Sequence, residues 1–146
     1  MKLILTVAMM TFASSPSFSA DLSKANLYDC QGRNTQVSFS TSSLTGEPQL
    51  HLSGSPFAGQ KLTATELEET RMGYQASVSV ANIYDASIDY TLIVPVVMTT
   101  RGQTFQVNGV LIKTSAGGLI SPESIPGPVQ QNTLTALRCR ATLVDF

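Results

Sequence analysis

The stretch LRCRATL at residues 137–143 alternates apolar and polar side chains with a period of two. Leu137, Cys139 and Ala141 fall on one side of an extended chain, whereas Arg138 and Arg140 fall on the other. A period of two is typical of a β-strand with one face buried and one face in water, which is the usual arrangement in antiparallel sheets. The stretch therefore predicts an antiparallel all-β fold.

The same alternation recurs along the chain. Four more stretches show it: 36–40 (QVSFS), 49–53 (QLHLS), 74–80 (YQASVSV) and 104–109 (TFQVNG). Turn-forming sequences separate such stretches, for example at residues 43–48, at residues 84–87 and at residues 99–103, where Gly102 suits a hairpin. Long helical patterns are lacking. We predict an all-β domain, a single antiparallel β-sandwich or flattened barrel of about 7–9 strands.

The chain has two cysteines, Cys30 and Cys139, near the two ends of the predicted domain. An oxidising compartment favours their pairing, and no Cys-x-x-Cys motif is present that would favour redox chemistry. In the chain-entropy model, closing a loop of ~100 residues stabilises the fold by about 4.7 kcal/mol. We predict a Cys30–Cys139 disulfide that joins the first and last strands.

Two segments leave alternatives open. Residues 62–67 (LTATEL) have the capping-box pattern of a helix start, but residues 63–72 also suit a Thr-rich strand, which we favour because the surrounding pattern is strand. Residues 88–98 are apolar on both faces, although Pro95 cannot donate a ladder hydrogen bond. We predict a bulge at Pro95 and a covering loop at residues 116–133; the alternative is an exposed apolar edge that pairs with a partner.

The first twenty residues predict a secretion signal. Lys2 precedes a short apolar stretch, and small residues follow at 14–20. Its removal would leave one domain at 21–146, secreted or periplasmic, with eight Lys and Arg residues against ten Asp and Glu. No further apolar run is long enough to span a membrane. Basic residues are not clustered, so we expect no nucleic-acid binding.

Catalytic patterns are scarce in this sequence. His51 is the one histidine and alternates with Leu50 and Leu52, so we place it in solvent. The chain has no Gly-x-Ser-x-Gly motif, and one His with a bonded cysteine pair cannot supply a zinc or copper site. Two acidic groups, Glu66 with Glu68 and Glu69, and Asp85 with Asp89, are interpreted as solvated or turn residues. We expect no enzyme activity, no metal and no cofactor.

One part of the chain resembles a known family. Residues 28–32 (YDCQG), the strand at 37–40 and the Ser53-Gly54-Ser55 sequence look like the small periplasmic inhibitors of c-type lysozyme. Phe57 is the nearest aromatic residue after the Ser-Gly loop. The resemblance implies an inhibitor of a secreted hydrolase that presents residues 53–60 to its target.

Three functional hypotheses follow from these patterns. The first is a non-enzymatic binding or interaction module with a protein or small-molecule partner, and the sequence leaves its oligomeric state open. Its candidate partner-binding loops contain Ser53, Gly54, Ser55, Phe57, Pro122, Pro126 and Pro128. The second is the hydrolase inhibitor. The third is a small-molecule or lipid carrier with an interior lined by Tyr74, Val78, Tyr90, Val94 and Val107.

Overall fold

The computed structural model describes residues 21–58, 60–80, 87–115 and 131–146. The predicted signal, residues 84–86 of the turn predicted at 84–87, and residues 116–130 of the predicted loop lie outside the described residues. Asp85 is among them. The described elements are, in chain order, β1 (Ser23–Lys24), β2 (Leu27–Gln31), β3 (Gln36–Ser40), β4 (Gln49–Ser53), the 3-10 helix η1 (Ser55–Phe57), β5 (Glu66–Thr70), β6 (Gly73–Val80), β7 (Ile88–Val94), β8 (Met98–Thr99), β9 (Thr104–Ser115) and β10 (Gln131–Thr142).

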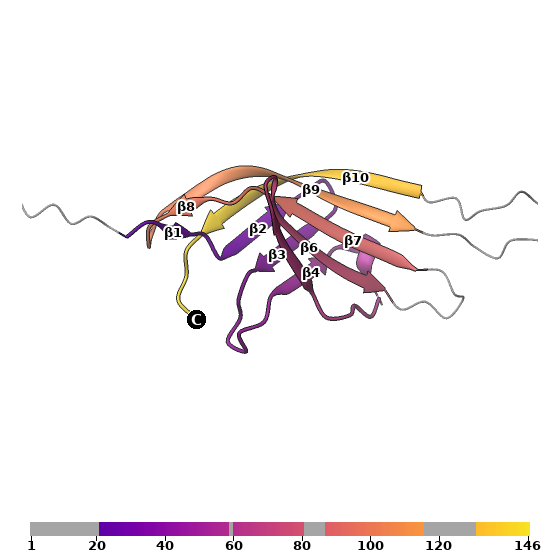
Figure 1. The fold of residues 1–146 in the computed structure, drawn as a ribbon. Helices are drawn as coiled ribbons and strands as arrows, with labels where there is room; N and C mark the ends of the chain where they lie inside the picture. The colour runs from indigo at the N-terminus through magenta and orange to yellow at the C-terminus, as the bar shows by residue number, and fades with distance from the viewer. Residues whose placement is uncertain (1–20, 59, 81–86, 116–130) are drawn as a thin grey trace, which may run out of the picture.

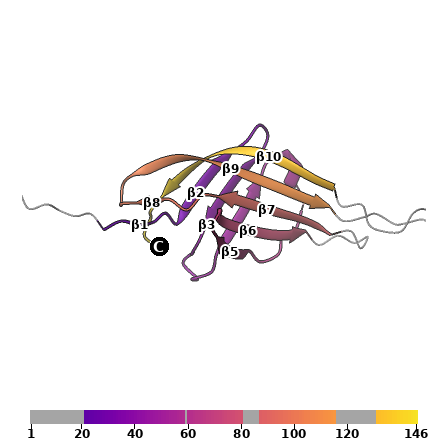
Figure 2. The same cartoon turned by 45° about the horizontal axis from the view of Figure 1, so that its top comes forward.

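Eight of these strands form one antiparallel sheet in the order β4-β3-β2-β10-β9-β7-β6-β5. A separate two-stranded sheet pairs β1 with β8 (Figure 1). The predicted all-β fold is confirmed, and the main sheet has eight strands. The two long strands β9 and β10 arch over the other strands, and the sheet curls around its core (Figures 1 and 2).

The alternating pattern decides which face of the sheet lies inside the curl. Along β6, Tyr74, Ala76, Val78 and Val80 are buried, whereas the intervening polar residues are more exposed. We call the buried side the inner face and the opposite side the outer face. Each polar residue that alternates with a core residue therefore lies on the outer face.

Three aromatic rings fill the centre of the curl. Tyr28 of β2 and Phe39 of β3 are direct cross-strand neighbours with ring centroids 5.8 Å apart. Tyr74 of β6 packs edge-on against both rings, at 6.0 Å from each centroid. Since β2 and β6 lie on opposite arms of the sheet, the rings hold the two arms together. Edge-to-face aromatic pairs stabilise a core beyond their area alone.

The two edges of the sheet approach each other. The backbone N–H of Leu50 in β4 donates to Oγ1 of Thr65, the residue just before β5, at 2.8 Å. Thr63, in the same segment, also bonds Ser79 of β6 through both backbone and side chain. The curled sheet is thus a flattened barrel closed at this seam by a threonine side chain rather than by a full strand ladder.

The Cys30–Cys139 disulfide is present. It joins directly opposite residues of β2 and β10, in the middle of the main sheet. The first strand is the short β1, so the bond connects the second strand, not the first, to the last. Gly109 of β9 lies beside the bond, and a Cβ there would come within 2.9 Å of the Cys139 sulfur. The close approach of the disulfide explains a glycine inside this strand.

The structure resolves both ambiguous segments. Residues 66–70 form β5, which confirms strand over helix there. The expected single strand at 88–98 is wrong: β7 ends at Val94, before Pro95, because Pro95 cannot extend the ladder. The chain resumes as β8, which pairs with β1. Moreover, β7 is a central strand between β9 and β6, not an exposed edge. The predicted loop at 116–133 is too long, because residues 131–133 belong to β10.

Replacing both cysteines by alanine should lower the free energy of unfolding by about 2 to 5 kcal/mol, since the long loop is no longer closed in the unfolded chain. Urea unfolding of the Cys30→Ala/Cys139→Ala variant would measure this loss. The reduced natural protein is the control and should match the variant. A variant as stable as the oxidised protein would show that the bond contributes nothing to stability.

Alkaline pH should destabilise the fold through Tyr28. Burial, as the largest cause, raises the pKa of Tyr28 to about 12 from 10.0, and its hydroxyl donates to the Pro95 carbonyl at 3.1 Å. The folded state therefore binds the phenolic proton more tightly than the unfolded state. This contribution is fully present below pH 10 and is lost as the pH rises toward about 12.

Urea unfolding between pH 9 and 12 would measure this decline. The matched variant Tyr28→Phe lacks the ionisable group. It should lose about 1 kcal/mol at neutral pH with the hydrogen bond, yet decline less steeply in alkali. Parallel stability curves for the two proteins would contradict the assignment.

Candidate functional site

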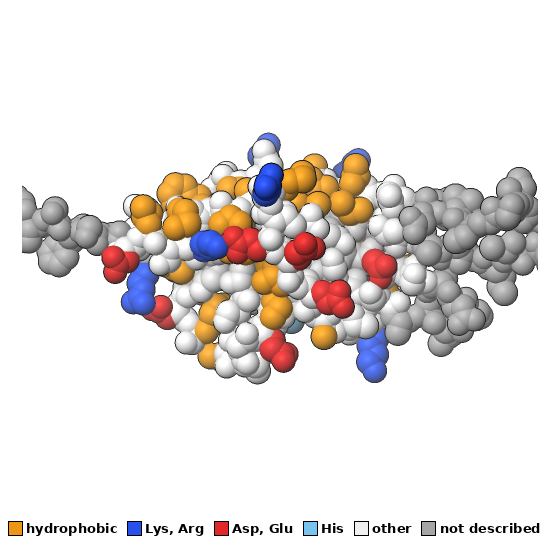
Figure 3. Space-filling view, in the orientation of Figure 1, with side chains coloured by type: hydrophobic (Ala, Val, Ile, Leu, Met, Phe, Trp, Pro, Cys, Tyr) orange, Lys and Arg blue, Asp and Glu red, His pale blue; other side chains and the backbone are white. Residues whose placement is uncertain are grey.

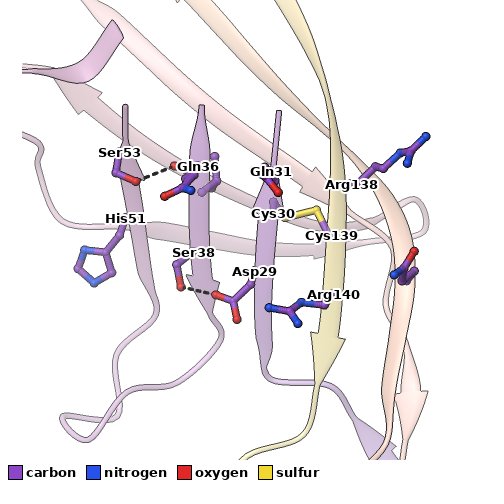
Figure 4. A pocket seen from close by; sticks show the side chains of 12 residues that line it. Asp29, Cys30, Gln31, Gln36, Ser38, His51, Ser53, Arg138, Cys139 and Arg140 are labelled. Carbon is purple, nitrogen blue, oxygen red and sulfur yellow. Dashed lines mark hydrogen bonds between the residues drawn. A yellow bond between two sulfur atoms is a disulfide. The ribbon is translucent and has the colours of Figure 1, made fainter. Parts of the chain in front are cut away.

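A pocket of about 470 Å³ lies over β2, β3, β4 and β10. Its lining residues are Asp29, Cys30, Gln31, Gln36, Val37, Ser38, His51, Ser53, Gln106, Arg138, Cys139 and Arg140. Figure 4 shows Ser53, His51, Gln36 and Ser38 on neighbouring strands, with Asp29 and Arg140 following across β2 and β10. Most of these side chains are polar, and we call the cavity the polar pocket.

The strand register arranges the polar side chains in two rows across the outer face. One row runs Gln106, Arg140, Asp29, Ser38 and His51, each opposite the next on the adjacent strand. The other row runs Asn108, Arg138, Gln31, Gln36 and Ser53. The rows are two residues apart along each strand, or about 6.8 Å at the rise of an extended chain.

Short polar contacts fix part of the pocket. The Ser38 hydroxyl donates to a carboxylate oxygen of Asp29 at 3.1 Å, and the Ser53 hydroxyl donates to the Gln36 carbonyl at 3.4 Å. The Nε2 atom of His51 lies 3.3 Å from the side-chain oxygen of Gln49. Among the described residues, His51 makes no hydrogen bond with a serine. The Ser38 hydroxyl is thus bonded to the Asp29 carboxylate on the neighbouring strand.

Arg138 and Arg140 are the free cations of the pocket. Neither side chain has a hydrogen bond or ion pair with another residue that the structure describes. Asp29 is the one acid among the lining residues, so the lining carries two positive charges against one negative. The whole chain has a net charge of −1. This pocket is therefore a locally basic surface on a slightly acidic protein, suited to an anionic ligand.

The predicted partner-binding residues fall in different places. Ser53 is exposed and lines the polar pocket. Gly54 and Ser55 follow it and are also exposed, where the chain turns into η1. Phe57 is 8 % exposed and packs edge-on against Tyr90 with ring centroids 5.1 Å apart, so it belongs to the core. Pro122, Pro126 and Pro128 lie outside the described residues.

The acidic groups considered in the sequence do not assemble a site. Glu66 and Glu68 lie on the outer face of the edge strand β5, and Glu69 pairs with Lys24 at 2.7 Å. Asp89 of β7 accepts a hydrogen bond from Ser79. In the part of the chain that the structure describes, no three His, Cys, Asp or Glu residues are grouped so as to hold a metal ion. The same residues include no helix with the length and apolarity to cross a membrane.

The residues considered for the lining of a carrier interior belong to the hydrophobic core. Tyr74, Val78, Tyr90 and Val94 are each at most 5 % exposed and belong to one continuous core cluster. Val107 packs against this cluster from its margin.

Most of the polar pocket could not be predicted from the sequence. The alternating pattern placed Gln36, Ser38, His51, Arg138 and Arg140 only on the solvent side of separate strands. The missing information was strand order, since β2 lies next to β10 although the bonded cysteines are 109 positions apart. The predicted disulfide was the one available signal, because it placed the arginines flanking Cys139 close to the residues flanking Cys30.

Comparison with known proteins gives no relative: no family model, no curated protein and no solved structure matches this chain. The resemblance to lysozyme inhibitors stays a prediction.

Proposed function

We propose that this protein is a non-enzymatic binding module that holds an acidic, extended segment of a partner protein in the polar pocket. The observation that supports it best is the pair Arg138 and Arg140, which line the pocket from one strand and have no hydrogen bond or ion pair with another described residue. Guanidinium groups bind carboxylates through paired, charge-assisted hydrogen bonds.

The spacing of the arginines favours a peptide. Alternate residues of a strand are about 6.8 Å apart, and alternate side chains of an extended peptide have the same spacing. A segment with acidic residues at every second position, lying along β10, can therefore meet both arginines. Gln31 and Gln36 would supply amide donors and acceptors beside it. Apart from the imidazole of His51, the lining has no ring, whereas a sugar site usually offers an aromatic platform.

Removing the two arginines should abolish most of the binding. The probe is a synthetic peptide with Asp at alternate positions, titrated into the protein by calorimetry. Arg138→Gln/Arg140→Gln should weaken its affinity by more than tenfold, because each charge-assisted hydrogen bond contributes about 1.5–3 kcal/mol. The affinity of the natural protein for the peptide should also fall as the salt concentration is raised, because salt screens the attraction between opposite charges.

A charge-matched variant controls for general electrostatics. Arg101→Gln/Lys113→Gln also removes two positive charges, but from residues outside the pocket lining. It should bind the peptide within about twofold of the natural protein. Equal losses in both double variants would overturn the proposal. Tight, arginine-dependent binding of polygalacturonate in place of the peptide would overturn the choice of a protein partner.

The proposal includes export of the chain, so that the binding module acts in a secreted or periplasmic setting. The sequence of residues 1–20 and the Cys30–Cys139 disulfide support this, since disulfides persist in oxidising compartments. Protein isolated from the periplasm or medium without reductant should lack the first 19 or 20 residues and weigh two hydrogens less than its reduced form. A full-length, reduced cytoplasmic product would contradict export.

A further inference from the structure

Strand β5 is itself an extended segment with acidic residues at every second position. Glu66 and Glu68 stand at alternate positions of this strand, both are exposed, and both lie on the outer face. Among the described residues neither carboxylate has an ion pair or a hydrogen bond, whereas Glu69 pairs with Lys24 at 2.7 Å. Glu66 and Glu68 thus offer two carboxylates about 6.8 Å apart along one strand.

The acidic pair of β5 matches the basic pair of the polar pocket in spacing. Arg138 and Arg140 are also alternate residues of one strand, and they also lack a hydrogen bond or ion pair with another described residue. An acidic strand laid along β10 therefore brings one carboxylate to each guanidinium, where charge-assisted hydrogen bonds form. Both strands are already held in the main sheet, so neither has to be ordered on binding.

The two charged strands lie on opposite sides of the flattened barrel. In one direction of the sheet order, β10 is separated from β5 by β9, β7 and β6. In the other direction it is separated from β5 by β2, β3 and β4, up to the seam at Thr65. Figure 2 shows β10 at the top and β5 at the bottom of the molecule. The acidic strand therefore cannot reach the pocket of its own chain, and only another copy can bring the two together.

The charge of the whole outer face is divided in the same way. Asp89 of β7 lies on the outer face opposite Ser79, on the side of the barrel that carries β5. Acidic side chains gather in Figure 3 where β6 and β7 run in Figure 1. The polar pocket has the opposite sign, with two arginines against Asp29. Unlike sides of two copies therefore attract each other, which steers their encounter.

We propose that the occupant of the polar pocket is strand β5 of a second copy of this chain, so that the protein associates head to tail. Glu66 and Glu68 of one copy then bind Arg138 and Arg140 of the next. An associated pair leaves one pocket and one β5 open, so heterologous contacts of this kind extend into chains or close into rings. The inference rests on the proposed function, because it names the partner segment that the pocket holds.

Sedimentation of the disulfide-bonded protein at two salt concentrations tests the association. The Debye length is about 30 Å at 0.01 M ionic strength and about 3 Å at 1 M. Protein at increasing concentration should form dimers and longer species at the lower ionic strength and return to monomer at the higher one. Glu66→Gln/Glu68→Gln should weaken the association at least tenfold, because it removes the charge-assisted hydrogen bonds. A natural protein that is monomeric at every concentration overturns the inference.

A charge-matched variant shows whether the position of the acidic residues matters. Asp21→Asn/Glu47→Gln also removes two negative charges, but from exposed residues outside β5. It should associate like the natural protein. Equal losses in the two double variants would show attraction by net charge alone and would contradict a contact made by β5.

Mixing two variants that each lack one half of the contact tests its direction. Glu66→Gln/Glu68→Gln keeps the natural pocket, and Arg138→Gln/Arg140→Gln keeps the acidic strand. Each should be monomeric alone. Their mixture should contain a complex with one copy of each and nothing longer, since only one natural contact remains between them. A mixture that stays monomeric, or that forms longer species, is incompatible with head-to-tail association.

Calorimetry with the peptide that has Asp at alternate positions separates this inference from the proposed function. Glu66→Gln/Glu68→Gln has an intact pocket and no competing strand, so it should bind the peptide at least as tightly as the natural protein. Peptide binding by a natural protein that stays monomeric overturns the inference and leaves the proposed function standing. A variant that does not bind the peptide contradicts the proposed function, and the inference fails with it.

Discussion

The pairing of β2 with β10 is the constraint on which the rest of the structure depends. It joins the β2–β3–β4 arm to the β10–β9–β7–β6–β5 arm, and it is fixed by a disulfide between residues 109 positions apart. Without this ladder the two arms would be separate open sheets, each with a single apolar face in water. With it, Tyr28 and Phe39 of one arm meet Tyr74 of the other, and the sheet can curl around one core.

The same ladder also creates the candidate binding surface. Inner-face packing requires Cys30, Cys139 and Val37 to point inward, so their chain neighbours Asp29, Arg138, Arg140 and Ser38 must point outward. The polar pocket is therefore the reverse side of the most constrained part of the core. A surface built on paired, disulfide-linked strands is pre-organised, which lowers the entropy that ordering would cost on binding.

The chemistry of the outer face changes from one part of the sheet to another. Over β2, β3 and β4 the outward positions hold amides, hydroxyls, His51 and charges, which suit a hydrated, anionic ligand. Over β7, β9 and β10 the rows at Leu134 and Ala136 become aliphatic.

The sequence by itself determined the all-β class, the Cys30–Cys139 bond and the direction of most side chains, because a period of two is a local property of an extended backbone. Local sequence also identified Pro95 as incompatible with a continuous strand, although the break at Val94 was predicted as a bulge. Only the tertiary structure decided strand order and register, and with them the polar pocket and the burial of Phe57. These depend on which distant strands pair, and that choice follows from packing of the whole core rather than from any single stretch.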